Sequence, residues 1–259
     1  NGFLCAKLIQ LDRKWRIGAV SYLNTKPLLY GFEQSGFIDS IELVQDFPAR
    51  IAAMLLNNEI DIGLVPVAII PENKAFHIVS DYCIGAVNEV ASVCLFSEVP
   101  MEQIETVILD YQSRTSVQLC KILLKHFWKK EVVFKNAELD FRNQISGKTA
   151  AVVIGDRAFE QRLISPFVYD LAAAWKDFTG LPFVFAAWVA NKKINEAFLL
   201  KFNEANAFGL QHIAEVVANI DYPLYDLTIY YTQNISYNFD ASKQEGLNNF
   251  LSYLKESNQ

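Results

Sequence analysis

The most constraining feature of the sequence is a regular alternation of short β-rich runs and helical segments in its N-terminal part. The β-rich runs occupy residues 16–23, 41–44 and 60–65. Asn24 or Thr25 is suited to cap the first helix, because short polar side chains accept hydrogen bonds from the free N–H groups at a helix start. The resulting β-α-β-α-β order favours a mostly parallel sheet with helices on its faces.

A second α/β cycle follows further along the chain. Its β-rich runs lie at 106–110 and 150–154, and a long amphipathic helix separates them. Another helix is expected between a cap at Asp170 and a closing glycine, Gly180. Helical patterns then dominate to about residue 220 and return from 242 to 254.

Two long apolar strands, at 90–97 and 183–190, are expected to link the two cycles. We therefore predict an α/β protein of two lobes with two crossovers, in which the ligand lies in the cleft between the lobes. The predicted lobes comprise residues 16–96 together with 190–259, and residues 97–189 inserted between them.

Composition narrows the classes of function. The chain is 52 % hydrophobic and 20 % charged, so it can bury a large core. We therefore do not expect an intrinsically disordered protein. A formal net charge of -6 argues against nucleic-acid binding, which favours a basic face. No apolar run reaches the roughly 18 residues that a membrane-spanning helix requires.

The cysteines and histidines suggest neither a disulfide framework nor a metal site. Cys5, Cys83, Cys94 and Cys120 form no C-x-x-C pair and are expected to be reduced thiols, which favours a cytoplasmic location. The histidines are isolated and show no metal-ligand spacing. We also find neither a P-loop nor a G-x-G-x-x-G run, so no nucleotide cofactor is expected.

The clearest candidate for a binding site is the run Ser113-Arg114-Thr115-Ser116 at a strand-to-helix junction. Free N–H groups, hydroxyls and a guanidinium together suit a carboxylate. Simple helix capping explains the same residues equally well.

Three other positions are weaker candidates. Gly155-Asp156 follows a strand, where a cap is the better interpretation. Asn24 stands at the carboxyl end of the first strand, where α/β sheets bind ligands, although a turn or cap residue is again the better interpretation. Ser92 has no nucleophile elbow around it and would ordinarily be a small core hydroxyl. The residues alone therefore indicate an anion-binding cleft and no particular reaction.

Taken together, several segments resemble the chorismate dehydratase family of the futalosine route to menaquinone. They are the runs at 20–28 (VSYLNTKPL), 113–117 (SRTSV), 153–158 (VIGDRA), 169–171 (YDL) and 179–186 (TGLPFVFA), with Trp175 and Trp188. The resemblance extends over about residues 16–255. Two departures are Asn88 and Ala172, each standing where the family pattern leads us to expect glycine.

The resemblance implies a periplasmic-binding-protein type II fold and a lyase that removes water from chorismate to give 3-[(1-carboxyvinyl)oxy]benzoate. It implies no metal and no cofactor. Asn24 and Ser92 would be the catalytic pair beside the reacting ring. Ser113, Arg114, Thr115 and Ser116 would hold a carboxylate of this small dianion, and Gly155 and Asp156 would line the opposite wall.

Other interpretations share the fold. A non-catalytic binding protein for a small carboxylate is the main alternative, because fold does not determine function. The related menaquinone-pathway enzyme acting on a futalosine derivative fits the Ser113–Ser116 and 179–183 runs less well, and a ligand-sensing transcriptional regulator fits least. A homodimer is compatible with the sequence.

Overall fold

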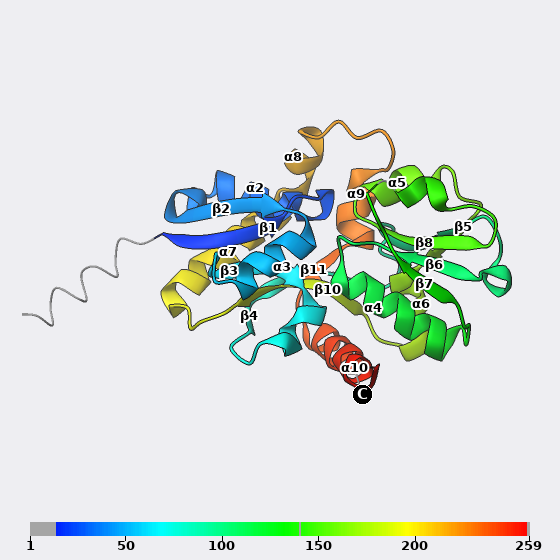
Figure 1. Ribbon diagram of the computed structural model, residues 1–259. Helices are drawn as coiled ribbons and strands as arrows, with labels where there is room; N and C mark the ends of the chain where they lie inside the picture. Colours follow the sequence, from blue (N-terminus) through cyan, green and yellow to red (C-terminus); the bar gives the residue numbers. More distant parts are fainter. Residues whose placement is uncertain (1–13, 140, 258–259) are drawn as a thin grey trace, which may run out of the picture.

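A computed structural model describes residues 14–139 and 141–257. The chain forms two sheets that lie side by side, each covered by helices (Figure 1). The first is six-stranded, in the order β11-β4-β10-β3-β1-β2. Its strands are β1 (Trp15–Val20), β2 (Ile41–Asp46), β3 (Ile62–Pro66), β4 (His77–Ala86), β10 (Phe183–Ala190) and β11 (Ser236–Asn238). The helices of this lobe are α2 (Lys26–Gln34), α3 (Pro48–Leu56), α7 (Glu196–Gln211) and α8 (Ile213–Ala218).

The second sheet has five strands, in the order β7-β6-β8-β5-β9. They are β5 (Val93–Ser97), β6 (Thr106–Leu109), β7 (Val133–Asn136), β8 (Thr149–Ile154) and β9 (Phe167–Asp170). The helices are α4 (Arg114–Ile122), which continues as one π-helical turn η5 (Leu123–Phe127), α5 (Arg157–Arg162) and α6 (Leu171–Thr179). The sequence-based expectation for α6 is confirmed, since Asp170 caps it and Gly180 follows it at φ +75°.

Both sheets are mixed rather than mostly parallel. β1 pairs in parallel with β2 and β3, as the β-α-β-α-β order predicts, but β10 runs antiparallel to both β3 and β4. In the second sheet, β6 is parallel to β7 and β8, whereas β5 is antiparallel to β8 and β9. β11 also runs antiparallel to β4. The other two antiparallel strands, β5 and β10, are those that follow the two crossings between the lobes.

The two strands expected to link the lobes each belong to a single sheet. β5 pairs only within the five-stranded sheet and β10 only within the six-stranded sheet. The predicted divisions at 96/97 and 189/190 therefore fall at the wrong ends of these strands, and the chain crosses between sheets within 87–92 and 181–182. Both strands are buried apolar runs, so their composition does not reveal which sheet pairs with them.

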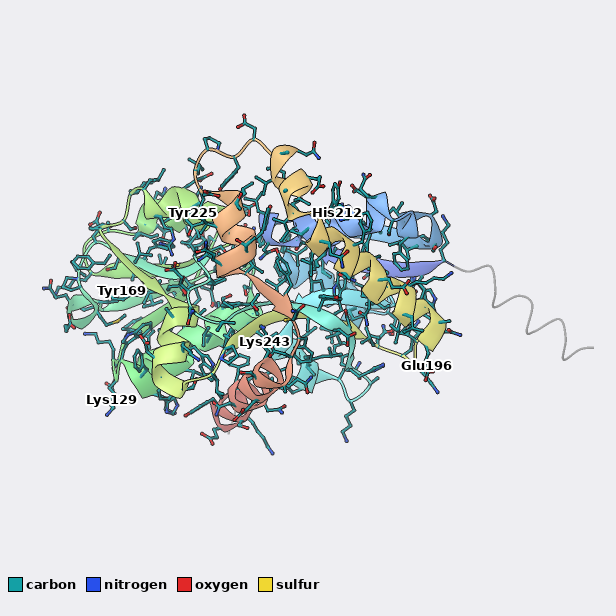
Figure 2. All side chains as sticks on the ribbon, turned by 180° about the vertical axis from the view of Figure 1, so that it is seen from behind. Lys129, Tyr169, Glu196, His212, Tyr225 and Lys243 are labelled. Carbon is teal, nitrogen blue, oxygen red and sulfur yellow. The ribbon has the colours of Figure 1, made fainter. Side chains whose placement is uncertain are left out.

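The C-terminal part of the chain contacts both lobes. β11 completes the six-stranded sheet, while helix α10 (Ala241–Ser257) packs on β10 and on α4. The segment formed by α9 (Leu227–Ile229) and the π-helical turn η7 (Tyr230–Asn234) packs against α5 of the second lobe. The Tyr225 ring just before it packs on Phe159 of α5, tilted by 31° with 4.5 Å between centroids. Figure 2 shows Tyr225 in this segment. The predicted assignment of 190–259 to the first lobe alone is thus too simple.

Close helix packing and one buried carboxylate fix the first lobe. A Cβ at Gly31 of α2 would lie 1.9 Å from the carbonyl oxygen of Ala205 in α7, so only glycine allows these helices to approach so closely. The buried Asp61 accepts hydrogen bonds from the side chains of Arg16 and Lys192, and thereby ties β1 and the segment after β10 to the start of β3.

The cysteine prediction is confirmed where it can be tested. Cys83, Cys94 and Cys120 are buried and free, and burial raises the pKa of each thiol. Cys5 lies outside the described residues. Within residues 14–139 and 141–257, no helix combines the length and apolar character needed to cross a membrane.

Candidate functional site

A small cavity of about 40 Å³ lies between the two sheets. Its walls come from the carboxyl ends of β1, β3 and β8, from the amino ends of α3 and α4, and from β4, β5 and β10. Four of the predicted site residues line it: Asn24, Ser113, Ser116 and Gly155. The carboxyl ends of parallel strands in both lobes therefore meet at one place, as α/β ligand sites require.

The amino end of α4 is built as the sequence predicts. Ser113 is the N-cap, and its Oγ accepts a hydrogen bond from the Ser116 amide at 3.1 Å. The same oxygen donates its own proton to Ser116 Oγ, 2.9 Å away. The Ser116 hydroxyl proton is thus available for a further acceptor, at a helix end where the dipole favours negative charge.

The two middle residues of this run have other partners. The buried Thr115 hydroxyl accepts a hydrogen bond from the Ala68 amide of the first lobe, at 3.1 Å. Nη1 of Arg114 donates to both carboxylate oxygens of Glu72, at 2.8 and 2.9 Å, in a groove beside α10. Neither side chain lines the cavity. Thr115 holds the lobes together through this hydrogen bond. Arg114 lies outside the small cavity, in a groove that Ser113 also lines.

Asn24 sits in the short 3-10 turn η1 (Leu23–Thr25) at the end of β1. Its Oδ1 accepts a hydrogen bond from the Thr25 hydroxyl at 3.1 Å, and its backbone carbonyl accepts one from the Tyr237 hydroxyl at 2.9 Å. These bonds fix the main chain and one side of the amide. The NH₂ group of Asn24 can then serve as a donor toward the cavity.

Ser92 stands at the end of a strained turn. Its amide donates to the Val90 carbonyl at 2.8 Å, and the intervening Ala91 has φ +64°, so the three residues form a γ-turn of the rarer, positive-φ kind. A positive φ at a non-glycine residue persists only where the surroundings enforce it.

Asp170 and Arg162 enforce that turn. The Asp170 carboxylate accepts hydrogen bonds from the amides of Val90 and Ala91, besides capping α6, while Arg162 Nε donates to the Ala91 carbonyl at 2.7 Å. The two side chains also form an ion pair of 3.5 Å. Burial raises the Asp170 pKa, an effect that its backbone hydrogen bonds oppose.

Ser92 lies directly behind the cavity wall. Its neighbour Val93 lines the cavity, and its carbonyl accepts a hydrogen bond from the amide of Gly155, another lining residue, at 2.9 Å. The fully buried Ser92 hydroxyl accepts a hydrogen bond from Tyr230 at 2.7 Å. Sequence patterns gave no sign of Tyr230, because it comes from the distant C-terminal segment and has no motif around it.

Gly155 and Asp156 join the lobes. Gly155 has φ +65°, and a Cβ there would lie 2.9 Å from the ring of Tyr22 in the first lobe. Asp156 Oδ1 accepts a hydrogen bond from the Leu23 amide at 3.0 Å, and the Asp156 carbonyl accepts one from Tyr222. Asp156 thus bridges the cleft next to the cavity, and burial raises its pKa.

Among the described residues that line the cavity, Tyr22 is the one ionisable side chain. Burial raises its pKa, so the phenol remains protonated at neutral pH. Its hydroxyl donates to Gln112, which also accepts from Arg157, and Arg157 pairs with the buried Asp110 at 2.7 Å. Nowhere in the described part of the chain do three or more His, Cys, Asp or Glu side chains gather as they would around a metal ion.

Residues 15–256 match a protein family described as menaquinone biosynthesis. The chain belongs to this family. It is 26 % identical over 268 residues to the chorismate dehydratase of Thermus thermophilus, a match that covers 93 % of this chain and 96 % of that protein. The chorismate dehydratase of Campylobacter jejuni is 25 % identical over 249 residues, covering 93 % and 98 %. The family resemblance indicated by the sequence motifs is confirmed.

Solved structures with the same fold are more distant in sequence. An Archaeoglobus fulgidus protein solved by a structural genomics consortium shares 12 % identity, with a TM-score of 0.72 and coverage of 96 % of this chain and 99 % of that one. The aliphatic sulphonate binding protein of Escherichia coli shares 14 %, with a TM-score of 0.62 and coverage of 95 % and 93 %. The predicted periplasmic-binding-protein fold, with its two lobes, is thus confirmed.

Proposed function

We propose that the protein is a chorismate dehydratase, which converts chorismate into 3-[(1-carboxyvinyl)oxy]benzoate and water in the futalosine route to menaquinone. The observation that carries the proposal is the convergence of Asn24 and the amino end of α4 on one cavity between the lobes, with the Ser92 turn directly behind its wall at Val93. Family membership over residues 15–256 and the names of the two relatives support it. The free, buried thiols fit a reducing compartment, so we place the enzyme in the cytoplasm.

The composition of the cavity favours a mechanism in which the substrate supplies its own base. Tyr22 is the one ionisable group among the described lining residues, and it stays protonated at neutral pH because burial raises its pKa. A carboxylate of the bound dianion can then remove the ring proton beside the enolpyruvyl ether. The electron pair of that C–H bond enters the conjugated ring, the neighbouring hydroxyl leaves as water with the proton that the carboxylate has taken up, and the ring becomes aromatic.

The protein's share of this reaction is to orient the dianion and to stabilise the charge that spreads over the ring. We assign the Asn24 amide and the Ser92 hydroxyl to hydrogen bonds beside the reacting carbons. The Ser113–Ser116 end of α4 would receive a carboxylate, mainly through the Ser116 hydroxyl and free backbone amides. Gly155 and Asp156 would form the opposite wall, Thr115 would hold the lobes, and Arg114 would need to leave Glu72 to reach a ligand.

Substrate binding requires the lobes to separate. A cavity of about 40 Å³ has room for only a few water molecules, whereas ligand pockets occupy roughly 300–1,000 Å³. The contacts that must break and reform are those across the cleft, chiefly the hydrogen bond from the Leu23 amide to Asp156 and that from the Ala68 amide to Thr115. Closure around the substrate would then exclude water from the reacting carbons.

Comparing turnover with binding tests the proposal and its main alternative, a binding protein for a small carboxylate. We expect Asn24→Ala and Ser92→Ala each to lower kcat/KM for chorismate on the order of a hundredfold while both remain folded. Calorimetry should show that both variants still bind chorismate. Saturable binding by the wild-type protein without turnover would favour the binding protein.

A further inference from the structure

We propose that Tyr230 is the residue that positions the Ser92 hydroxyl for the reaction. This inference rests on the proposed function, in which Ser92 acts on the bound substrate. Neither Ser92 nor Tyr230 lines the cavity of this closed structure, but Ser92 adjoins the lining residue Val93. Tyr230 reaches the site through its hydrogen bond to Ser92, so its effect on turnover would pass through Ser92.

The Ser92 side chain is held from several directions. Its backbone amide and carbonyl are bonded to Val90 and Gly155, which fixes the main chain. Its Oγ accepts the Tyr230 hydrogen bond at 2.7 Å, and both residues are fully buried. Because a serine hydroxyl has one proton, and Tyr230 occupies a lone pair, the Ser92 proton must point away from Tyr230. The tyrosine thereby selects the direction in which Ser92 can donate.

The Tyr230 ring itself cannot easily shift. It packs edge-on against Phe159 at 5.0 Å between centroids and against Tyr225 at 6.1 Å, and it contacts Tyr231 at 5.5 Å. It also begins the π-helical turn η7, a distortion that often occurs at functional sites. A phenylalanine would keep these ring contacts, so the Tyr230 hydroxyl is the part of the residue devoted to Ser92.

The experiment compares Tyr230→Phe with Tyr225→Phe as a matched control. Each removes one phenol oxygen from the same aromatic cluster, but the Tyr225 hydroxyl bonds to Asn234 rather than to Ser92. We expect Tyr230→Phe to lower kcat for chorismate about tenfold and to change KM less than about twofold. Tyr225→Phe should stay within about twofold of the wild type in both. Thermal unfolding of every variant provides the check on folding.

Adding Ser92→Ala distinguishes positioning from a general structural effect. If Tyr230 acts through Ser92, the double variant Ser92→Ala/Tyr230→Phe should be no slower than Ser92→Ala alone. An unchanged kcat in Tyr230→Phe, or a full further loss in the double variant, would overturn the inference while leaving the proposed function intact. A wild-type protein that does not turn over chorismate would instead refute the proposed function, and the inference with it.

Discussion

Replacing Gly155 by alanine should loosen the junction between the lobes. The new Cβ would lie 2.9 Å from Cδ2 and Cε2 of Tyr22 and 3.0 Å from its Cγ, closer than such atoms approach one another. The ring cannot turn aside freely, because its hydroxyl is bonded to Gln112. The backbone at residue 155, with φ +65°, is also unfavourable for alanine.

The two effects can be separated by magnitude. Placing alanine at a positive φ costs about 1 kcal/mol, and overpacking a buried contact costs roughly 1–3 kcal/mol. We therefore expect Gly155→Ala to lower the free energy of unfolding by about 3 kcal/mol, or the Tm by very roughly 6–12 °C. Gly180→Ala is the control, since Gly180 has φ +75° but no atom within 4 Å of its Cβ position. It should lose only about 1 kcal/mol.

Thermal unfolding of both variants, followed by circular dichroism, measures this difference. Gly155→Ala should also lower kcat/KM for chorismate, because the lobes could not close fully around the substrate, whereas Gly180→Ala should not. Equal losses of stability in the two variants would show that Tyr22 does not pack on Gly155 as described. The reasoning about the closed cleft would then be wrong.

Three further predictions concern other parts of the molecule. Burial alone would raise the pKa of Asp61, but hydrogen bonds from its two basic partners lower it to about 2, so its contribution to stability is present above about pH 4 and lost as the pH falls toward 2. Asp61→Asn should therefore be less stable than the wild type by roughly 2 kcal/mol at pH 7. Urea unfolding measured at falling pH should show this difference shrinking in that acid range. In steady-state kinetics, Ser116→Ala should raise KM for chorismate about tenfold, and Arg114→Ala should raise it less than about threefold. A larger increase in KM for Arg114→Ala than for Ser116→Ala would place the carboxylate at Arg114. Asp170→Asn should relax the turn at Ala91 and lower kcat at least tenfold. Calorimetry should show that chorismate binding is nearly unchanged. Normal turnover by this variant would contradict the role given to that turn.

Local patterns predicted the elements whose burial is regular. β1, β2 and β3 follow from apolar runs, and the helices between them from apolar periodicity and a proline in the first turn of each. The side-chain cap expected at Asn24 or Thr25 does not form, because Thr25 is the N-cap of α2 but its side chain makes no capping hydrogen bond. β4 was missed, because its first half has only Ile78 and Val79 between polar residues, with neither an alternating nor a continuous apolar pattern, and its last part carries Gly85 in an otherwise apolar run. The sheet membership of β5 and β10 could not be predicted either, since the partner of an apolar strand is decided by contacts distant in sequence.

The candidate site was partly predictable for a similar reason. Asn24, Ser113, Ser116 and Gly155 stand next to strand ends or helix starts, where local sequence signals exist, and they meet at the cavity. Tyr230 reaches Ser92 from a segment 138 residues away, so no local pattern could connect them. Arg114 is in the predicted run, yet its side chain pairs with Glu72, a choice that depends on how the lobes face each other.

The most direct test of the proposed reaction is to incubate the purified wild-type protein with chorismate and identify the product by liquid chromatography and mass spectrometry. We predict an aromatic dicarboxylate that has lost one molecule of water relative to chorismate, formed faster than in protein-free buffer and much more slowly with Asn24→Ala. Chorismate recovered unchanged at the rate of the protein-free control would contradict the proposed dehydratase.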